Sequence, residues 1–241
     1  MNALATIRVE DIAQHAAFRR LDSIAGIDHD LRYATSNNFD GRVLYAGIDC
    51  AWLRAEAAAG LEAAGDWLAR THRGHRILVL DALRPQRVQE AIWRDVAGTP
   101  AARYFANPER GSIHSFGMAV DVTLLDAQGR ELDMGSGFDE MSVASHPSLE
   151  AEQLAAGVIN RAHIAAREML RGAMAAGGFA GIRTEWWHFD HGDRGLVRRE
   201  YQGWCERWTV ETSPPLWAPC SPPRRCQHPH SLPRACCARR A

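Results

Sequence analysis

Apolar residues recur at helical and at strand-like spacings along the first two hundred residues, and each spacing predicts a type of element. The segment Trp52–Thr71 is rich in alanine, carries leucines at roughly helical spacing and ends near Gly74, so we expect a helix there. Gln153–Ala176 predicts a longer helix, which the glycine pair after it would stop. A third helix is expected over Gln86–Val96, because the proline before it fits the first turn of a helix.

Shorter apolar runs predict strands. Ile77–Leu80 is a β-type run, and Ala119–Leu125 predicts a buried strand that contains a single carboxylate, Asp121. Phe179–Phe189 predicts a final strand region with a turn at Gly181. With 241 residues, of which 46% are hydrophobic, the chain is long enough to bury one sizeable core.

The composition changes abruptly at Ser213. From there to Ala241, proline, arginine, cysteine and histidine dominate, and aliphatic residues nearly disappear. Such a segment buries too little apolar surface to offset the entropy lost on ordering, so we place a domain boundary near Thr212 and expect residues 213–241 to be disordered. Its cysteines and histidines suggest a metal site as a second interpretation, but the paired Cys-x-x-Cys spacing of structural zinc sites is missing. These residues are Cys220, Cys226, His228, His230, Cys236 and Cys237.

Charge and hydropathy exclude several classes of function. The formal net charge is −1, which gives no reason to expect binding to nucleic acid. All 28 basic residues are arginine, which we interpret as a bias of the coding sequence and not as a functional signal. No apolar run reaches about eighteen residues, so we expect no membrane-spanning helix. The first residues lack the apolar segment of a secretory signal, which predicts a cytoplasmic protein, with the periplasm as the alternative location.

The first segment with candidate chemistry is Ser112–Asp121. A carboxylate inside an apolar strand is costly unless it is paired or bound to a metal ion, and His114 lies seven residues before Asp121. On a straight strand the two side chains would face opposite sides, but Gly117 between them allows a bend that brings both to one ion. The alternative is a surface turn followed by a strand whose aspartate pairs with an arginine. The segment alone leaves both interpretations open.

The second segment is Glu185–His188. A catalytic zinc site uses three protein ligands and keeps a fourth position for water, and His188 would supply a second imidazole. A carboxylate that is not a ligand can take the proton of that water, and Glu185 is close enough in the sequence to do so. The alternative places the two tryptophans in the core and makes His188 an interior histidine with a backbone partner. Taken alone, this segment favours the alternative.

Arg84, which follows the expected strand at Ile77–Leu80, is the third feature. An arginine at a strand end can supply fixed positive charge to a developing oxyanion. Its alternative role is a salt bridge, for example to Asp81. Helix-borne metalloprotease motifs are excluded because the chain has no His-Glu-x-x-His, and it also lacks a P-loop and a Gly-x-Gly-x-x-Gly motif.

Together these segments resemble a known family, the zinc D-alanyl-D-alanine dipeptidases. That family carries Ser-x-His-x-x-Gly-x-Ala-x-Asp followed by Glu-x-x-His, and this chain fills every fixed position of both motifs. The positions are Ser112, His114, Gly117, Ala119, Asp121, Glu185 and His188. The resemblance covers roughly residues 20–210 and includes Asp-x-x-Arg-Pro at 81–85, Tyr-Ala-Thr at 33–35, and the segments 38–41 and 134–141. Within 38–41, Asp40 stands where the family has threonine.

The resemblance implies a zinc metallopeptidase that hydrolyses the dipeptide D-alanyl-D-alanine or a close relative. One zinc ion per chain would be held by His114, Asp121 and His188. Glu185 would act as general base and then as general acid, and Arg84 would stabilise the oxyanion of the transition state.

The family also implies a fold and a substrate subsite. We expect residues 1–212 to form one α+β domain with a mostly antiparallel central sheet flanked by helices, the fold these peptidases share with the Hedgehog signalling domain. Asp139, Ser112 and Tyr33 would face the amino terminus of the substrate. For these three residues the sequence offers no support apart from the resemblance.

Two rival functions remain at this point. One is a D,D-carboxypeptidase or endopeptidase of the same group that trims longer peptidoglycan peptides, which a series of substrate lengths would separate from a dipeptidase. The other is a zinc-stabilised binding module without catalysis. The presence of both Glu185 and Arg84 argues against the binding module, because a structural zinc site needs neither.

Overall fold

The computed structural model describes residues 8–201 of the 241-residue chain. The domain boundary expected near Thr212, the segment 213–241 and its candidate metal site lie outside the described residues. Among the helices that are described, none has the length and hydropathy needed to cross a membrane.

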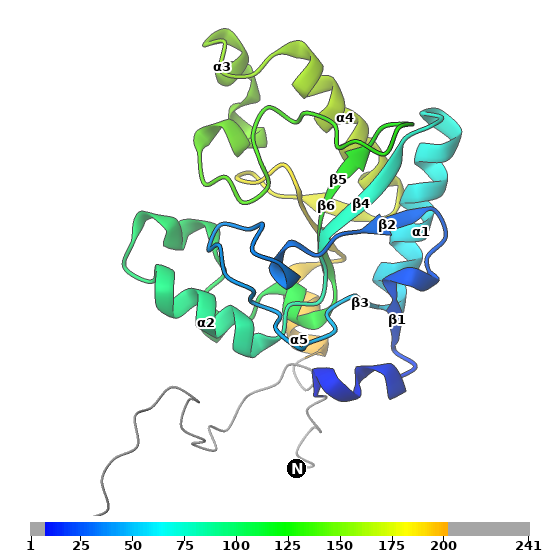
Figure 1. Cartoon of the computed structure of the whole chain (residues 1–241), viewed down its shortest axis with the longest axis vertical. Coiled ribbons are helices and arrows are strands. Elements are labelled where there is room, and N and C mark those ends of the chain that lie inside the picture. Colours follow the sequence, from blue (N-terminus) through cyan, green and yellow to red (C-terminus); the bar gives the residue numbers. More distant parts are fainter. Residues whose placement is uncertain (1–7, 202–241) are drawn as a thin grey trace, which may run out of the picture. The chain divides into compact units, whose positions relative to one another are not determined.

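A five-stranded sheet forms the centre of the described region (Figure 1). Its strand order is β2 (Ile27–His29), β4 (Arg76–Asp81), β5 (Ala119–Leu125), β7 (His188–His191) and β6 (Phe179–Gly181). β2 pairs with β4 in parallel, whereas the other three neighbouring pairs are antiparallel. The expected α+β fold with a mostly antiparallel central sheet is therefore confirmed.

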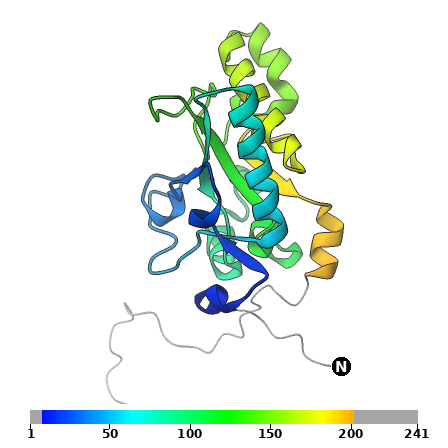
Figure 2. The same cartoon turned by 90° about the vertical axis from the view of Figure 1, so that its right-hand side faces the viewer.

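Two long helices pack together on this sheet. α1 (Ala55–Thr71) contacts β4, and α4 (Arg161–Ala176) contacts β5 and β6; Figure 2 shows α1 crossing in front of the sheet. α1 and the residue that follows α4 approach closely at Gly60 and Gly177. A Cβ atom on Gly177 would lie 2.2 Å from the carbonyl oxygen of Gly60, so only glycine permits this approach.

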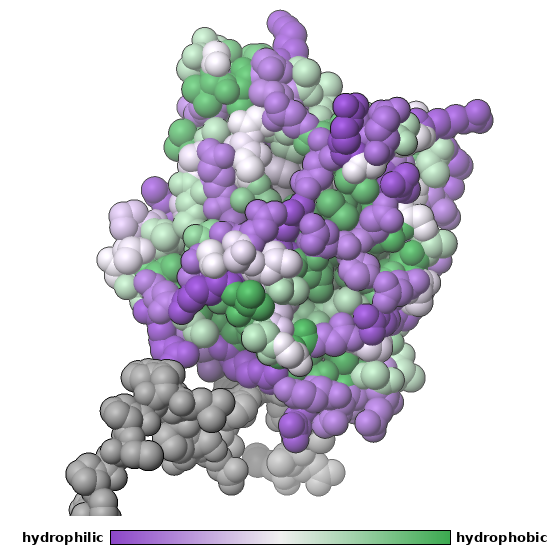
Figure 3. Space-filling model, in the orientation of Figure 1, coloured by the Kyte–Doolittle hydropathy of each residue, from purple (hydrophilic) through white to green (hydrophobic). Residues whose placement is uncertain are grey.

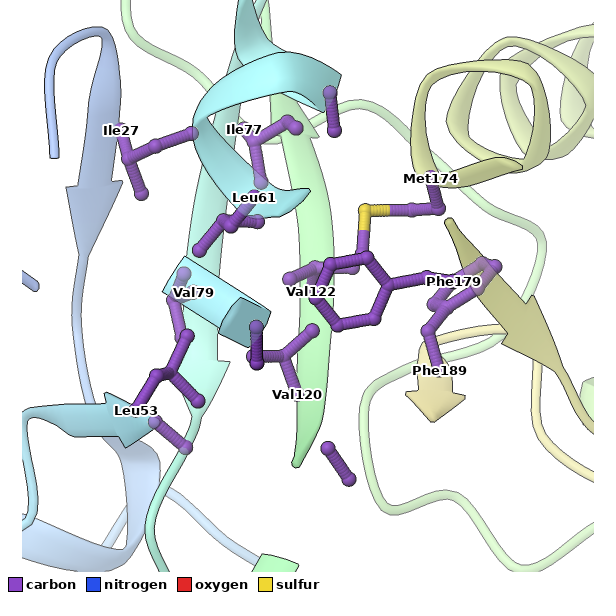
Figure 4. Close-up of a cluster of buried hydrophobic side chains, with 14 of the residues drawn as sticks. Ile27, Leu53, Leu61, Ile77, Val79, Val120, Val122, Met174, Phe179 and Phe189 are labelled. Atoms are coloured by element: carbon purple, nitrogen blue, oxygen red, sulfur yellow. The ribbon is translucent and has the colours of Figure 1, made fainter. Parts of the chain in front are cut away.

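The main hydrophobic core lies between these two helices and the sheet. Figure 4 shows Leu61 of α1 beside Ile77 and Val79 of β4, and Met174 of α4 facing Val122 of β5, and all five side chains are fully buried. All seven residues of β5 are buried, as expected for a strand in the middle of a covered sheet. The strand that contains the Asp121 carboxylate is therefore enclosed by the core.

The remaining elements surround this core. β1 (Phe18–Arg20) pairs with β3 (Trp52–Arg54) in a separate two-stranded antiparallel sheet. α2 (Gln86–Val96) has the bounds expected from the sequence and packs in a second apolar cluster with Tyr33 and Tyr45. The other helices are α3 (Glu150–Ala155) and α5 (Arg194–Glu200), together with the short 3-10 helices η1 (Val9–Gln14), η2 (Leu21–Ser23), η3 (Arg32–Ala34), η4 (Pro100–Tyr104), η5 (Pro108–Arg110), η6 (Ile113–Phe116), η7 (Val143–Ser145) and η8 (Pro147–Leu149).

Two of the expected helices have different bounds in the structure. The first three residues of the expected helix Trp52–Thr71 form β3, because they pair with β1 and bury Leu53 completely. The expected helix Gln153–Ala176 is divided into α3 and α4. Gly157 adopts a left-handed backbone with φ 70°, and the side chain of Asn160 accepts hydrogen bonds from the first turn of α4, so a new helix starts there.

Apolar residues on the surface are scattered. On the face shown in Figure 3, hydrophilic residues cover much of the area and apolar residues appear between them in small groups. The exposed large apolar side chains of the described region are Val43, Val143, Val158 and Leu196, which come from separate segments of the chain. Isolated apolar residues of this kind are normal for a protein surface.

Candidate active site

The bend expected at Gly117 is present and joins η6 to β5. Gly117 ends η6 in the left-handed region with φ 68° and ψ 24°. A Cβ atom there would lie 3.0 Å from the Phe18 ring and 3.1 Å from the backbone nitrogen of Arg54. His114 precedes the bend and Asp121 follows it. The two side chains therefore need not face opposite sides, as they would on a straight strand.

His188 reaches the same place from the neighbouring strand. In the antiparallel pairing of β5 with β7, Asp121 stands directly opposite His188, and directly opposite residues point to the same face of a sheet. The oxygen Oδ1 of Asp121 lies 2.9 Å from Nδ1 of His188 and 3.3 Å from Nε2 of His114. The two imidazole nitrogens are 3.1 Å apart. Two segments distant in the sequence, Ser112–Asp121 and Glu185–His188, therefore bring three potential metal-ligand atoms within 4.8 Å of one another.

The outer nitrogen of each histidine has its own partner. Nδ1 of His114 donates a hydrogen bond to the carbonyl oxygen of Ala82 at 2.8 Å. Nε2 of His188 donates to Oδ1 of Asp190 at 2.9 Å. These bonds fix both ring orientations and leave the inner nitrogens available as metal ligands, which is the usual arrangement around a bound metal ion.

The carboxylate of Asp121 is kept ionised in spite of its burial. Burial alone would raise its pKa, but His114 and His188 lower it well below the usual value. Two imidazoles and one ionised carboxylate form the donor set that catalytic zinc sites use. The residues present therefore fit a zinc ion.

Arg84 is buried beside these three residues and is held in place by two neighbours. Its Nε and Nη2 atoms donate to Oδ2 of Asp81 at 3.0 and 2.7 Å, and Nη1 donates to Oε1 of Gln89 at 3.1 Å. Nη2 also lies 3.4 Å from Oδ2 of Asp121. The hydroxyl of Tyr45 donates to Asp81 at 2.6 Å. The salt bridge to Asp81 considered from the sequence is thus formed, and it orients the guanidinium toward the metal-ligand cluster.

Glu185 is buried close to the cluster and does not belong to it. Its carboxylate has no hydrogen-bond partner among residues 8–201, and burial raises its pKa to about 7. A carboxyl group with such a pKa can both accept and release a proton near neutral pH.

Asp139 has an unusual backbone and an unsatisfied carboxylate. Its φ of 58° makes it the one non-glycine residue of the described region with a positive φ. Oδ1 accepts a hydrogen bond of 3.4 Å from the hydroxyl of Tyr33, while Oδ2 is buried and has no partner among the described residues. Burial, followed by the negative charge of Asp121, raises the pKa of Asp139 well above its usual value. A ligand with a positive charge would stabilise this carboxylate.

A cavity of about 320 Å³ opens onto all of these groups. Every side chain that the sequence indicated for the site contributes to its lining. They are Tyr33, Arg84, Ser112, His114, Asp121, Asp139, Glu185 and His188.

The sequence did not indicate several other residues around the cavity. Asp190 stands two positions after His188 on the same strand, and its spacing of two residues was a usable signal. Arg110, Arg194 and Arg198 also line the cavity, but no motif connects them.

Comparison with known proteins gives one consistent set of relatives. A family model described as D-ala-D-ala dipeptidase matches residues 15–205. The D-alanyl-D-alanine dipeptidase of Escherichia coli is 37% identical over 167 residues, 68% of this chain and 78% of the relative. That of Streptomyces coelicolor is 32% identical over 187 residues, 69% of this chain and 86% of the relative. That of Synechocystis sp. is 28% identical over 218 residues, 78% of this chain and 86% of the relative.

Among solved structures, the LdcB LD-carboxypeptidase is similar with a TM-score of 0.38 and 17% sequence identity. The match covers 64% of this chain and 65% of that chain.

Proposed function

The chain belongs to the D-ala-D-ala dipeptidase family, and on this premise we propose that it hydrolyses D-alanyl-D-alanine with one zinc ion held by His114, Asp121 and His188. One observation carries the proposal. The three ligand side chains converge from η6, β5 and β7, while the carboxylate of Glu185 lies in the same cavity and outside the ligand set. A separate carboxylate is what a hydrolytic zinc site needs and what a structural zinc site lacks.

Glu185 moves the proton in this reaction. When bound, the zinc ion polarises the scissile carbonyl and acidifies the attacking water. The Glu185 carboxylate takes a proton from that water while the oxygen of the water bonds to the carbonyl carbon. Glu185 then gives the proton to the amide nitrogen as the carbon–nitrogen bond breaks, which releases two molecules of D-alanine.

Arg84 stabilises the negative charge that develops on the carbonyl oxygen. Its guanidinium is held in place by Asp81 and Gln89, so little reorganisation is needed as the charge forms. Its burial also strengthens the interaction, because little water screens it.

The amino terminus of the dipeptide pairs with Asp139 in this proposal. The buried, unpartnered Oδ2 atom of Asp139 and the hydroxyl of Tyr33 provide an anionic and a polar oxygen. Ser112, which lines the same cavity, adds a third oxygen. A free α-ammonium group satisfies these atoms, and an acylated amine does not.

Comparing the free dipeptide with its N-acetylated form tests the proposal. Purified protein should release D-alanine from D-Ala-D-Ala and lose this activity with a chelator. Removing one partner of a buried charge pair costs about 3–5 kcal/mol, which corresponds to roughly two to four decades in kcat/KM. N-acetyl-D-Ala-D-Ala should be poorer by that factor. If the acetylated peptide is cut within about tenfold of the free dipeptide, a carboxypeptidase or endopeptidase replaces the dipeptidase assignment.

A further inference from the structure

We propose that Arg110 and Arg198 bind the C-terminal carboxylate of the dipeptide, the group carried by the leaving D-alanine. The inference rests on the proposed function and extends it. The roles given above provide a partner for the substrate's amine, its carbonyl and the transferred proton, but none for this carboxylate.

Three arginines line the cavity on the side of α5. Arg110 ends η5, while Arg194 and Arg198 are one helical turn apart on α5. Nε and Nη2 of Arg198 both donate to the carbonyl oxygen of Gly111 at 3.2 Å. This contact ties α5 to the residue before Ser112, so the arginine cluster is built into the wall of the active site.

The charges in this cluster are not balanced. Arg194 forms an ion pair with Asp190. Arg110 and Arg198, in contrast, have no carboxylate within ion-pair distance among residues 8–201. Burial, together with the like charges of Arg110 and Arg194, lowers the pKa of Arg198. Positive charges gathered at a cavity wall repel one another, and an anion bound between them relieves the repulsion.

The position of the cluster suits the far end of a dipeptide. Asp139 is connected to the metal-ligand cluster through Tyr33 and Arg84. Of the three arginines, Arg194 is connected to the metal-ligand cluster through Asp190 and His188. An extended dipeptide separates its ammonium and carboxylate groups by about 7 Å. The planar guanidinium group also matches a carboxylate in shape and hydrogen-bonding geometry.

The inference is tested by removing the negative charge from the substrate and the positive charge from the protein. The zinc-loaded full chain and the variants Arg110→Gln, Arg198→Gln and the double variant are assayed with D-Ala-D-Ala and with its C-terminal amide. The parent should prefer the acid, which means a higher kcat/KM for D-Ala-D-Ala than for its C-terminal amide. The double variant should lose roughly ten- to a hundredfold of that preference, the size expected for hydrogen bonds between charged groups. Arg199→Gln, an exposed residue of α5 outside the cavity lining, is the matched control and should keep the parent's preference.

Two results would overturn the inference, and they are distinguishable. A folded double variant that keeps the parent's preference for the acid overturns the carboxylate site alone. No turnover of D-Ala-D-Ala by the zinc-loaded parent overturns the proposed function and this inference with it. If Arg198→Gln fails to fold, Arg110→Glu is assayed instead, because Arg110 is exposed. This variant should lose more than about tenfold of the preference for the acid over the amide. An unchanged preference counts against the site.

Discussion

Glu185 sits in a buried position that brings the pKa of its carboxyl group to about 7. A general base must be ionised, so kcat/KM should fall as the pH drops through the pKa of this group. A zinc ion nearby adds positive charge, which favours the carboxylate and moves the acidic limb to lower pH. The profile of kcat/KM against pH for D-Ala-D-Ala should therefore show its acidic limb at or below about pH 7. A limb centred clearly above that value would contradict the assignment of this residue as the base.

Substitution of Glu185 distinguishes a general base from a metal ligand. Glu185→Ala should retain one bound zinc ion and lose about 10²–10⁴-fold in turnover, the usual contribution of a general base. His114→Ala serves as the comparison and should lose the metal as well as the activity. Metal analysis of the two purified variants gives the answer. If Glu185→Ala no longer holds stoichiometric zinc, Glu185 belongs among the ligands.

Arg84→Lys probes the stabilisation of the oxyanion. Lysine keeps the charge but cannot reproduce the fork of donors that binds Asp81 and Gln89. We expect kcat to fall by roughly 10–1000-fold and KM to change less, because the interaction is proposed to form mainly in the transition state. Steady-state kinetics with D-Ala-D-Ala measures both constants. An effect confined to KM would instead make Arg84 a ground-state binding residue.

Among the elements, the turn between η6 and β5 positions the proposed metal ligands His114 and Asp121 relative to each other. Gly117→Ala should destabilise the protein by about 1–2 kcal/mol through its left-handed backbone alone. The added Cβ would also press on the backbone of Arg54 at 3.1 Å and displace His114 relative to Asp121. Zinc affinity, measured by competition with a chelator, should therefore fall together with the melting temperature.

A second glycine provides the matched control for this experiment. Gly157 has a similar φ of 70°, but an added Cβ would meet nothing within 4 Å. Gly157→Ala should lower the melting temperature and leave the zinc affinity unchanged. Equal zinc affinity in both variants would show that the turn at Gly117 does not position the ligands.

The bounds of the elements show what a sequence pattern can predict. β5 and α2 have the expected bounds, because the apolar pattern within each segment determines them. The residues of β3 fall within a segment whose apolar pattern predicts a helix, because the partner strand β1 lies more than thirty residues away and leaves no local signal. The break between α3 and α4 had local signals in Gly157 and Asn160, but the helical spacing of the apolar residues on either side obscured them.

At the scale of the whole molecule, the site divides into residues with motifs and residues brought in by folding. His114, Asp121 and His188 belong to short motifs, and the turn at Gly117 and the antiparallel pairing of β5 with β7 bring them together. Arg110 and Arg198 lie 88 positions apart in the chain, and only the packing of α5 against η6 places them in one cavity wall. No spacing rule connects two such residues, so the sequence could not indicate them.

The proposed dipeptidase activity requires one zinc ion, held by the cluster of two histidines and one aspartate. Titration of the metal-free full chain with zinc, with D-Ala-D-Ala turnover measured at each step, tests this requirement. We predict that turnover rises from the metal-free baseline and saturates at one equivalent of zinc per chain. The His114→Ala variant should stay inactive at every zinc concentration. Full turnover in the metal-free protein, or zinc-dependent turnover in His114→Ala equal to that of the parent, would contradict the account.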